Sequence, residues 1–280
     1  MDGPGVLSTL DGGVDQRVGR DAGGVIAVLR TFADGRLFGT RTGVGPARVL
    51  ALHGWGRSHR DFDAAVGPSF GGASLDAVAL DLPGFGATPP PPEVWGAAEY
   101  ARCVAQVLDE MAAPVVVVGH SFGGRVAVHL AAEMPERIQA LVLTGVPLLR
   151  LAPPRRPAPA YRLQRALHRA GLVSDERLER ARRRYGSSDY RAASGIMRPV
   201  HSKSVAESYG PQLDAVACPV TLLWGDDDTT VPVAVAEAAL ARLRAGRTGD
   251  AAVLVTVQGA GHLLPLTAPG ELRAAVDRYL

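Results

Sequence analysis

Ser121 lies among small residues in the segment Gly119-His120-Ser121-Phe122-Gly123-Gly124, directly after four consecutive valines. A serine hydroxyl at this position can act as a nucleophile if a sharp strand-to-helix turn exposes it. The glycines favour that interpretation, because side chains at positions 119 and 123 would collide where the chain reverses direction. The alternative is an ordinary strand-to-helix connection in which glycine only saves space.

A serine hydroxyl is a poor nucleophile until a base takes its proton, and the base needs an acid that fixes its tautomer. The chain has seven histidines, and His262 is the one that stands in a Gly-rich loop directly after a candidate strand. Three consecutive aspartates, Asp226, Asp227 and Asp228, follow another apolar run. The residues alone leave open which of the three would act as the acid.

These side chains must be positioned by the elements around them. Short apolar runs are expected to be strands at residues 25–31, 37–42, 48–52, 76–81, 115–118, 138–144, 220–224 and 252–257. Helical spacing predicts helices over 95–111, 122–134, 233–243 and 268–280. Strands that are apolar on both faces and alternate with helices indicate a mostly parallel sheet. We therefore expect an α/β fold with eight strands, helices on both faces and a ligand site at the carboxyl ends of the strands.

One segment interrupts the alternation. Residues 150–210 contain no convincing strand, open with a proline-rich stretch and continue with helical periodicity. This segment has 14 basic and 5 acidic residues, a net charge of +9. We expect a core at residues 23–147 and 211–280, a helical cap inserted at 148–210, and a disordered tail at 1–22.

Composition limits the class of protein. The chain has 280 residues, 47% of them hydrophobic, and a net charge of only +2, which gives no general reason to bind nucleic acid. No signal-peptide pattern opens the sequence, and no apolar run reaches the roughly 18 residues of a membrane helix. Two cysteines, Cys103 and Cys218, form no disulfide framework and are expected to be small buried side chains. We expect a cytoplasmic protein without membrane or nucleic-acid partners.

Five motifs occur in a defined order along the predicted elements. They read LHGWG at 52–56, DLPGFG at 81–86, GHSFGG at 119–124, LLWGDDD at 222–228 and GAGHLLP at 259–265. With these motifs the chain resembles the α/β-hydrolase superfamily over about residues 25 to 280, apart from much of the cap. The resemblance implies a serine hydrolase of the esterase or haloperoxidase-like branch, with no cofactor and no metal.

The resemblance also assigns roles to residues. It implies that Ser121 is the nucleophile, His262 the base and Asp228 the acid, the last by counting from Gly225 in a Gly-x-x-Asp pattern. Asp226 and Asp227 are then solvated turn residues. The backbone N–H groups of Trp55 and Phe122 would form the oxyanion hole.

The motifs also bear on the role of Asp81 and on the branch of the superfamily. Asp81 resembles a structural carboxylate of the family, so we assign it no catalytic role. A serine at position 121, where haloalkane dehalogenases have an aspartate, argues against that branch.

The substrate does not follow from the fold. We expect a small-molecule ester or a related acyl bond, while a ligand receptor or a biosynthetic lyase or cyclase that retains the triad stays open as an alternative. The arginines of the cap allow two interpretations. They either form a solvated surface that reflects an Arg-rich sequence, or one or two of them, such as Arg150 and Arg198, attract an anionic substrate.

Overall fold

In the part of the chain that the structure describes, eight strands form one sheet in the order β1-β2-β4-β3-β5-β6-β7-β8. The computed structural model describes residues 28–67, 74–151, 158–185 and 187–280, so the predicted tail at 1–22 lies outside the described residues. The strands are β1 Leu29–Phe32, β2 Leu37–Thr42, β3 Val49–Leu52, β4 Ala77–Asp81, β5 Val115–His120, β6 Ile138–Thr144, β7 Val220–Gly225 and β8 Ala252–Val257. The predicted α/β fold with a mostly parallel eight-stranded sheet is confirmed.

The sheet is antiparallel at one edge and parallel elsewhere. β2 pairs antiparallel with both β1 and β4, whereas β4, β3, β5, β6, β7 and β8 run parallel. In this register Leu52 of β3 lies beside Gly119 of β5, and His120 lies beside Thr144 of β6. The carboxyl ends of the central strands therefore meet at one edge of the sheet, as the ligand-site rule for such sheets requires.

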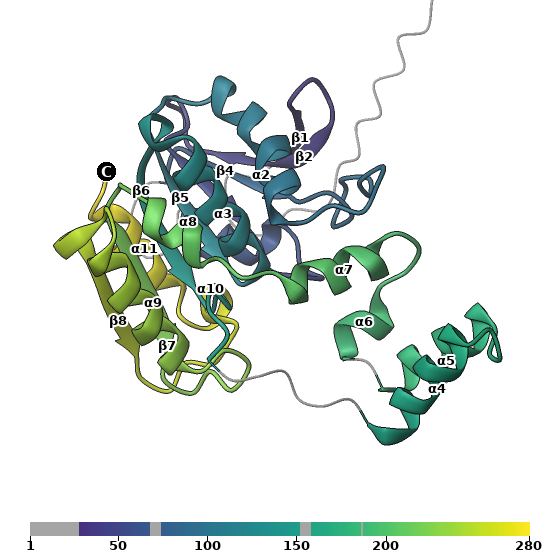
Figure 1. Cartoon of the computed structure of the whole chain (residues 1–280). Helices are drawn as coiled ribbons and strands as arrows, with labels where there is room; N and C mark the ends of the chain where they lie inside the picture. Colours follow the sequence, from purple (N-terminus) through teal and green to yellow (C-terminus); the bar gives the residue numbers. More distant parts are fainter. Residues whose placement is uncertain (1–27, 68–73, 152–157, 186) are drawn as a thin grey trace, which may run out of the picture.

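Helices cover both faces of the sheet (Figure 1). The α-helices outside the inserted segment are α1 Asp63–Val66, α2 Ala97–Ala105, α3 Phe122–Glu133, α8 Gly210–Ala215, α9 Val233–Ala245, α10 Leu264–Thr267 and α11 Pro269–Asp277. Short 3₁₀ turns are η1 His59–Phe62, η3 Gln106–Glu110, η4 Pro135–Arg137 and η5 Gly249–Ala251. One apolar core lies under α2, α3, α8 and α9, and a second lies under α1, α10 and α11.

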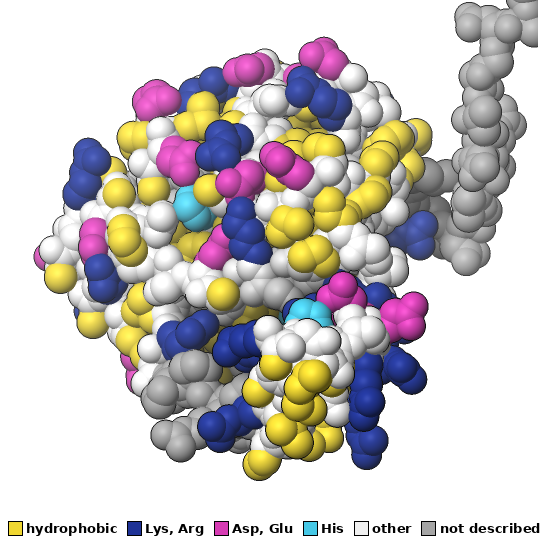
Figure 2. Space-filling model, turned by 45° about the vertical axis from the view of Figure 1, so that its right-hand side comes forward, with side chains coloured by type: hydrophobic (Ala, Val, Ile, Leu, Met, Phe, Trp, Pro, Cys, Tyr) yellow, Lys and Arg dark blue, Asp and Glu magenta, His cyan; other side chains and the backbone are white. Residues whose placement is uncertain are grey.

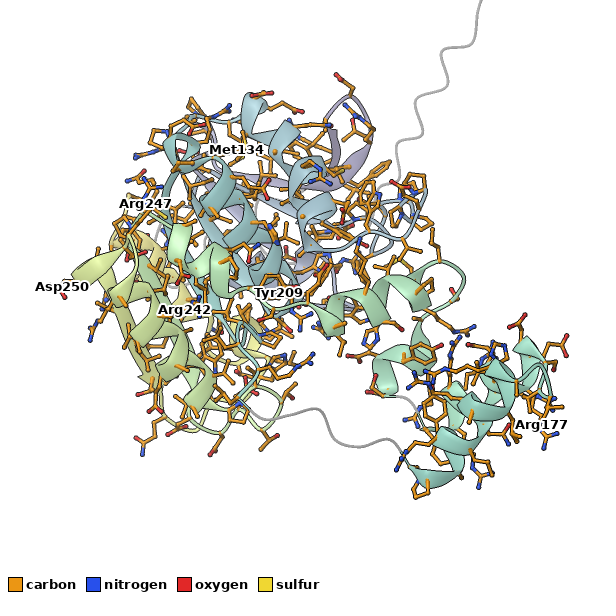
Figure 3. The ribbon with its side chains drawn as sticks, in the orientation of Figure 1. Met134, Arg177, Tyr209, Arg242, Arg247 and Asp250 are labelled. Carbon is orange, nitrogen blue, oxygen red and sulfur yellow. The ribbon has the colours of Figure 1, made fainter. Side chains whose placement is uncertain are left out.

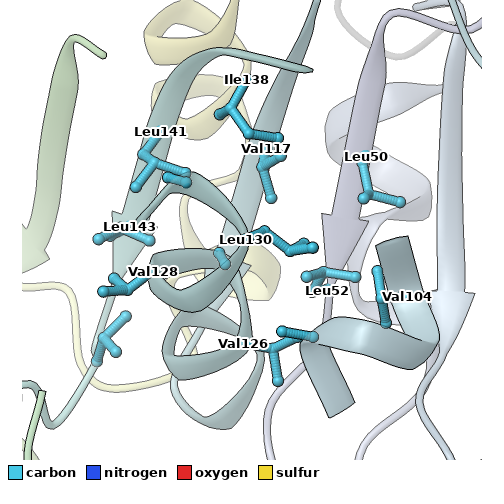
Figure 4. Packing of buried hydrophobic residues seen from close by; sticks show 14 of the residues in the cluster. Leu50, Leu52, Val104, Val117, Val126, Val128, Leu130, Ile138, Leu141 and Leu143 are labelled. Atoms are coloured by element: carbon cyan, nitrogen blue, oxygen red, sulfur yellow. The ribbon is translucent and has the colours of Figure 1, made fainter. Parts of the chain in front are cut away.

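Residues along each central strand alternate between the two cores because successive side chains of a strand point to opposite faces. Leu50 and Val117 belong to the core under α3, while Val49 and Val116 belong to the other core. Figure 4 shows α3 side chains packed against side chains of the strands in the first of these cores. Burial on both faces explains why these strands are continuous runs of Val, Leu and Ala rather than alternating patterns.

Among the described residues between β6 and α8, four helices form the inserted segment: α4 Pro159–Arg169, α5 Asp175–Tyr185, α6 Ser188–Ala192 and α7 Met197–Ala206. α4 and α5 pack on each other and lie away from the sheet, whereas α7 lies next to the core (Figure 1). Arg125 of α3 anchors α7 through bonds to the carbonyl and the hydroxyl of Ser204, at 2.6 and 2.7 Å. A salt bridge of 3.2 Å between Lys203 and Glu99 is a second anchor.

The predicted elements differ from the observed ones mainly at their ends. The helix expected over 95–111 is α-helical only over Ala97–Ala105 and continues as the 3₁₀ turn η3. η1, α1 and α10 are too short to give a periodic signal and were not predicted. Both cysteines are free thiols, Cys218 buried and Cys103 partly buried. None of the described helices combines the length and apolarity needed to cross a membrane.

Candidate active site

Ser121 sits between β5 and α3 in strained backbone geometry. Its φ is +48° and its ψ is −110°, a conformation that residues with a side chain rarely adopt. The Ser121 N–H donates to the carbonyl of Thr144 at 2.9 Å, and the Gly123 N–H donates to the carbonyl of His53 at 3.0 Å. These two bonds fix the turn to the neighbouring strands on either side.

The glycines around Ser121 are required by close contacts. A Cβ at Gly123 would lie 2.1 Å from the carbonyl oxygen of Leu52, and a Cβ at Gly119 would lie 2.5 Å from the Cα of Gly124. Both obstacles are backbone atoms, which cannot rotate away. The prediction that side chains at 119 and 123 would collide is therefore confirmed.

His262 joins Ser121 to Asp228. Its Nε2 lies 3.3 Å from the Ser121 Oγ, and its Nδ1 lies 2.8 Å from Asp228 Oδ2. With Nδ1 donating to the carboxylate, Nε2 is left as the acceptor that faces the serine hydroxyl. The three predicted residues thus come together in one hydrogen-bonded chain, although they are separated by 141 and 34 positions in the sequence.

Asp228 is held in place from two directions. Its Oδ1 accepts the N–H groups of Thr230 and Val231 at 2.9 and 2.8 Å, and its side chain is only 1% exposed. Burial opposes ionisation of this carboxyl, but the hydrogen bonds from His262, Val231 and Thr230 outweigh it and lower its pKa. The carboxylate is therefore charged at neutral pH and oriented toward the imidazole.

The two neighbouring aspartates lie elsewhere. Asp226 and Asp227 are exposed, and Asp226 accepts the N–H of Gly259 at 2.7 Å. Asp81, expected to be structural, is fully buried and accepts hydrogen bonds from the N–H groups of His59 and Ala87, both at 2.8 Å. It ties the turn after β3 to the turn after β4.

The two residues predicted to form the oxyanion hole, Trp55 and Phe122, lie in turns that are hydrogen-bonded to each other. Phe122 is the first residue of α3, where the helix itself offers no acceptor for the N–H and the helix dipole favours negative charge. Trp55 lies in the turn after β3, which the bond from Gly123 to His53 connects to the Ser121 turn. Within the described ranges, neither N–H donates to a backbone oxygen of a turn or loop.

Aromatic rings line the region around these amides. The Trp55 ring meets Phe85 edge to face at 4.9 Å, Phe122 at 5.4 Å and His201 of α7 at 4.9 Å. Phe85 and His201 had no predicted role, because only the folded chain brings the turn after β4 and the inserted α7 onto Trp55. The wall they form is suited to an apolar group of a substrate.

His120 supports the loop that carries His262. It is 1% exposed, its Nε2 donates to the carbonyl of His262 at 2.9 Å, and the two rings are 5.0 Å apart. Burial lowers the pKa of His120 to about 4. The imidazole of His120 is therefore neutral at pH 7 and places no positive charge beside His262.

The two arginines at the ends of the predicted cap are engaged in local contacts. Arg150 donates to the carbonyl of Val205 at 3.0 Å, and Arg198 pairs with Glu179 at 3.4 Å. In the part of the chain that the structure describes, no group of three or more His, Cys, Asp or Glu side chains is arranged to hold a metal ion.

The family model described as "Alpha/beta hydrolase family" matches residues 49–275. The chain belongs to the alpha/beta hydrolase family. The match includes the turns that carry Trp55 and Phe85, the Ser121 turn and the two loops that carry Asp228 and His262. It also runs through the inserted helices.

Individual proteins resemble this alpha/beta hydrolase either over a short segment or at low sequence identity. Lipase LipV of Mycobacterium tuberculosis is 41% identical over 100 residues, and the match covers 35% of this chain and 37% of LipV. The pimeloyl-[acyl-carrier protein] methyl ester esterase of Aromatoleum aromaticum is 27% identical and is covered to 96%, against 82% of this chain. A thermophilic esterase from Thermogutta terrifontis shares the fold with a TM-score of 0.61 and 21% identity, over 92% of this chain and 98% of the other.

Proposed function

We propose that this alpha/beta hydrolase is a serine hydrolase that cleaves an ester or a related acyl bond of a small molecule through an acyl-enzyme on Ser121. The observation that carries the proposal is the hydrogen-bonded chain from Ser121 Oγ through His262 to Asp228, at 3.3 and 2.8 Å. The positive φ of Ser121 adds to it, because strained residues cluster at functional turns.

The geometry allows each step of acyl transfer. His262 Nε2 takes the proton of the Ser121 hydroxyl as Oγ attacks the carbonyl carbon. The N–H groups of Trp55 and Phe122 then stabilise the oxyanion; one such donor is typically worth about 3–4 kcal/mol. His262 returns the proton to the leaving alcohol, which departs and leaves the acyl group on Ser121. A water molecule deprotonated by His262 then attacks the acyl carbon. The bond to Oγ breaks, the carboxylic acid leaves, and His262 returns the proton to the serine.

An ester is favoured over other acyl bonds by two lines of support. The relative from Aromatoleum aromaticum is named for a methyl ester and aligns over most of both chains. The aromatic wall of Trp55, Phe85 and His201 offers contact to an apolar acyl or alcohol group next to the serine.

The proposal is tested with a panel of short-chain chromogenic esters and a fluorophosphonate probe. We expect turnover of at least one ester, labelling of the wild-type chain, and no labelling of Ser121→Ala, whereas Ser187→Ala, which changes a serine at the start of α6, should be labelled normally. Labelling of Ser121→Ala at the wild-type rate contradicts the covalent mechanism. Labelling of Ser121 without turnover of any ester favours the receptor or lyase alternative.

A further inference from the structure

The inserted helices border an open cavity at the surface that the proposed mechanism does not use. Its volume is about 190 Å³, and it lies between α4, α5, α6 and α7. The residues that line it are Tyr161 of α4, Arg182 and Tyr185 of α5, Tyr190 of α6 and Ser202 of α7. Three phenol rings, a guanidinium and a hydroxyl thus converge on one space from four helices.

The lining combines flat apolar walls with polar atoms at their edges. Tyr190 donates its hydroxyl to Glu179 at 3.0 Å, and the rings of Tyr161 and Tyr185 lie in contact at a centroid distance of 6.1 Å. Ser202 donates its hydroxyl to the carbonyl of Arg198 at 3.1 Å. These contacts orient the lining side chains in the absence of a ligand.

The cluster around the cavity carries an excess of positive charge. Glu179 is the shared partner of three guanidinium groups: Arg198 at 3.4 Å, Arg182 at 3.6 Å and Arg183 at 3.7 Å. One carboxylate against three guanidiniums leaves a charge of +2. Figure 2 shows Lys and Arg side chains gathered on the lobe that the inserted helices form. This surface therefore attracts anionic ligands.

One aromatic residue, His201, contacts both the lining of the cavity and the candidate active site. The Tyr190 ring contacts the ring of His201 at a centroid distance of 6.2 Å, and His201 contacts the Trp55 ring at 4.9 Å. Ser202 of the lining directly follows His201 on α7. A ligand in the cavity therefore touches the helix that also contacts the Trp55 ring through His201.

We propose that this cavity binds a single aromatic ring that carries a carboxylate, with the carboxylate paired to Arg182 and the ring held between the tyrosines. A cavity of about 150 Å³ holds a benzene molecule, whereas pockets for drug-sized ligands begin at about 300 Å³. The size of 190 Å³ thus fits one ring with a small substituent. Edge-to-face contacts with tyrosine rings and a bidentate bond to a guanidinium recognise the two parts of such a ligand.

The test is titration calorimetry of the intact chain with benzoate and with benzamide, its neutral analogue of similar shape. We expect benzoate to bind at least fivefold more tightly than benzamide. Arg182→Gln should weaken benzoate at least fivefold and leave benzamide unchanged. Arg177→Gln is the matched control, because Arg177 is an exposed arginine of the same helix that does not line the cavity (Figure 3). It should bind benzoate as the wild-type chain does.

Equal affinities for benzoate and benzamide overturn the proposal, as does equal weakening by Arg182→Gln and Arg177→Gln, which would report the general charge of the surface. Undiminished benzoate binding to Arg182→Gln also overturns it, because the ligand would then occupy another site. None of these measurements requires ester turnover, so they are independent of the proposed hydrolase activity.

A kinetic measurement then identifies the source of the ligand. Competitive inhibition of ester hydrolysis by benzoate, relieved in Arg182→Gln, assigns the cavity to the distal end of a substrate. Binding without competition assigns it to a separate aromatic acid.

Discussion

At the scale of single residues, the Ser121, His262 and Asp228 side chains form one chain of hydrogen bonds, so their removal should not be additive. We expect His262→Ala to lower kcat by about 10⁴-fold, because the serine then has no base. The double variant Ser121→Ala, His262→Ala should be no slower than either single variant. Steady-state kinetics on the best ester of the panel measures this, and a double variant slower by the product of the two single effects contradicts a concerted triad.

A second residue-scale prediction separates the three aspartates. Asp228→Asn keeps the size of the side chain but removes the carboxylate that fixes the His262 tautomer, so kcat should fall by about 10⁴-fold. Asp227→Asn, at an exposed position of the same turn, should change kcat less than twofold. The comparison uses the same ester and the same pH, and a large loss in Asp227→Asn with normal Asp228→Asn kinetics would reassign the acid.

At the scale of elements, the Ser121 turn depends on the absence of side chains where α3 approaches β3. Gly123→Ala places a Cβ 2.1 Å from the backbone oxygen of Leu52, which cannot move without disturbing the sheet. We expect a loss of roughly 2–3 kcal/mol in the free energy of unfolding. Gly261→Ala is the control, because a Cβ there meets nothing within 4 Å. Urea denaturation of both variants checks this, and equal stabilities contradict the steric account.

The elements also show what the sequence alone could predict. The buried strands were located because their runs of Val and Leu have no helical period, and β6 and β8 match the expected ranges at both ends. Counting from Gly225 selected Asp228, the aspartate that contacts His262. The contact of His201 with Trp55 and the cavity around Arg182 could not be predicted, because they depend on how the inserted helices fold back over the core.

At the scale of the whole molecule, buried histidines couple stability to pH. Burial lowers the pKa of both His53 and His120 from 6.5 to about 4. Between these values the unfolded chain binds protons that the folded chain does not, so acidification favours unfolding. Stability should be full above pH 6.5 and fall progressively toward pH 4, by up to about 3 kcal/mol for each histidine. Carboxyl groups whose pKa is lowered in the folded chain, such as that of Asp228, cause a further loss of stability at still lower pH.

His53 provides the test of this dependence. Its Nδ1 donates to the Gly54 carbonyl at 2.7 Å and its Nε2 accepts the Leu82 N–H at 3.0 Å, an arrangement available only to neutral imidazole. His53→Gln offers an amide that does not titrate. We expect this variant to be less stable than the wild-type chain at pH 7 but to lose less stability between pH 7 and pH 4.5. Urea unfolding at pH 7 and pH 4.5 measures how much stability the wild-type chain and the variant each lose. Identical losses would mean that His53 is protonated in the folded state or excluded from protonation in the unfolded one, and either result removes it as a source of acid sensitivity.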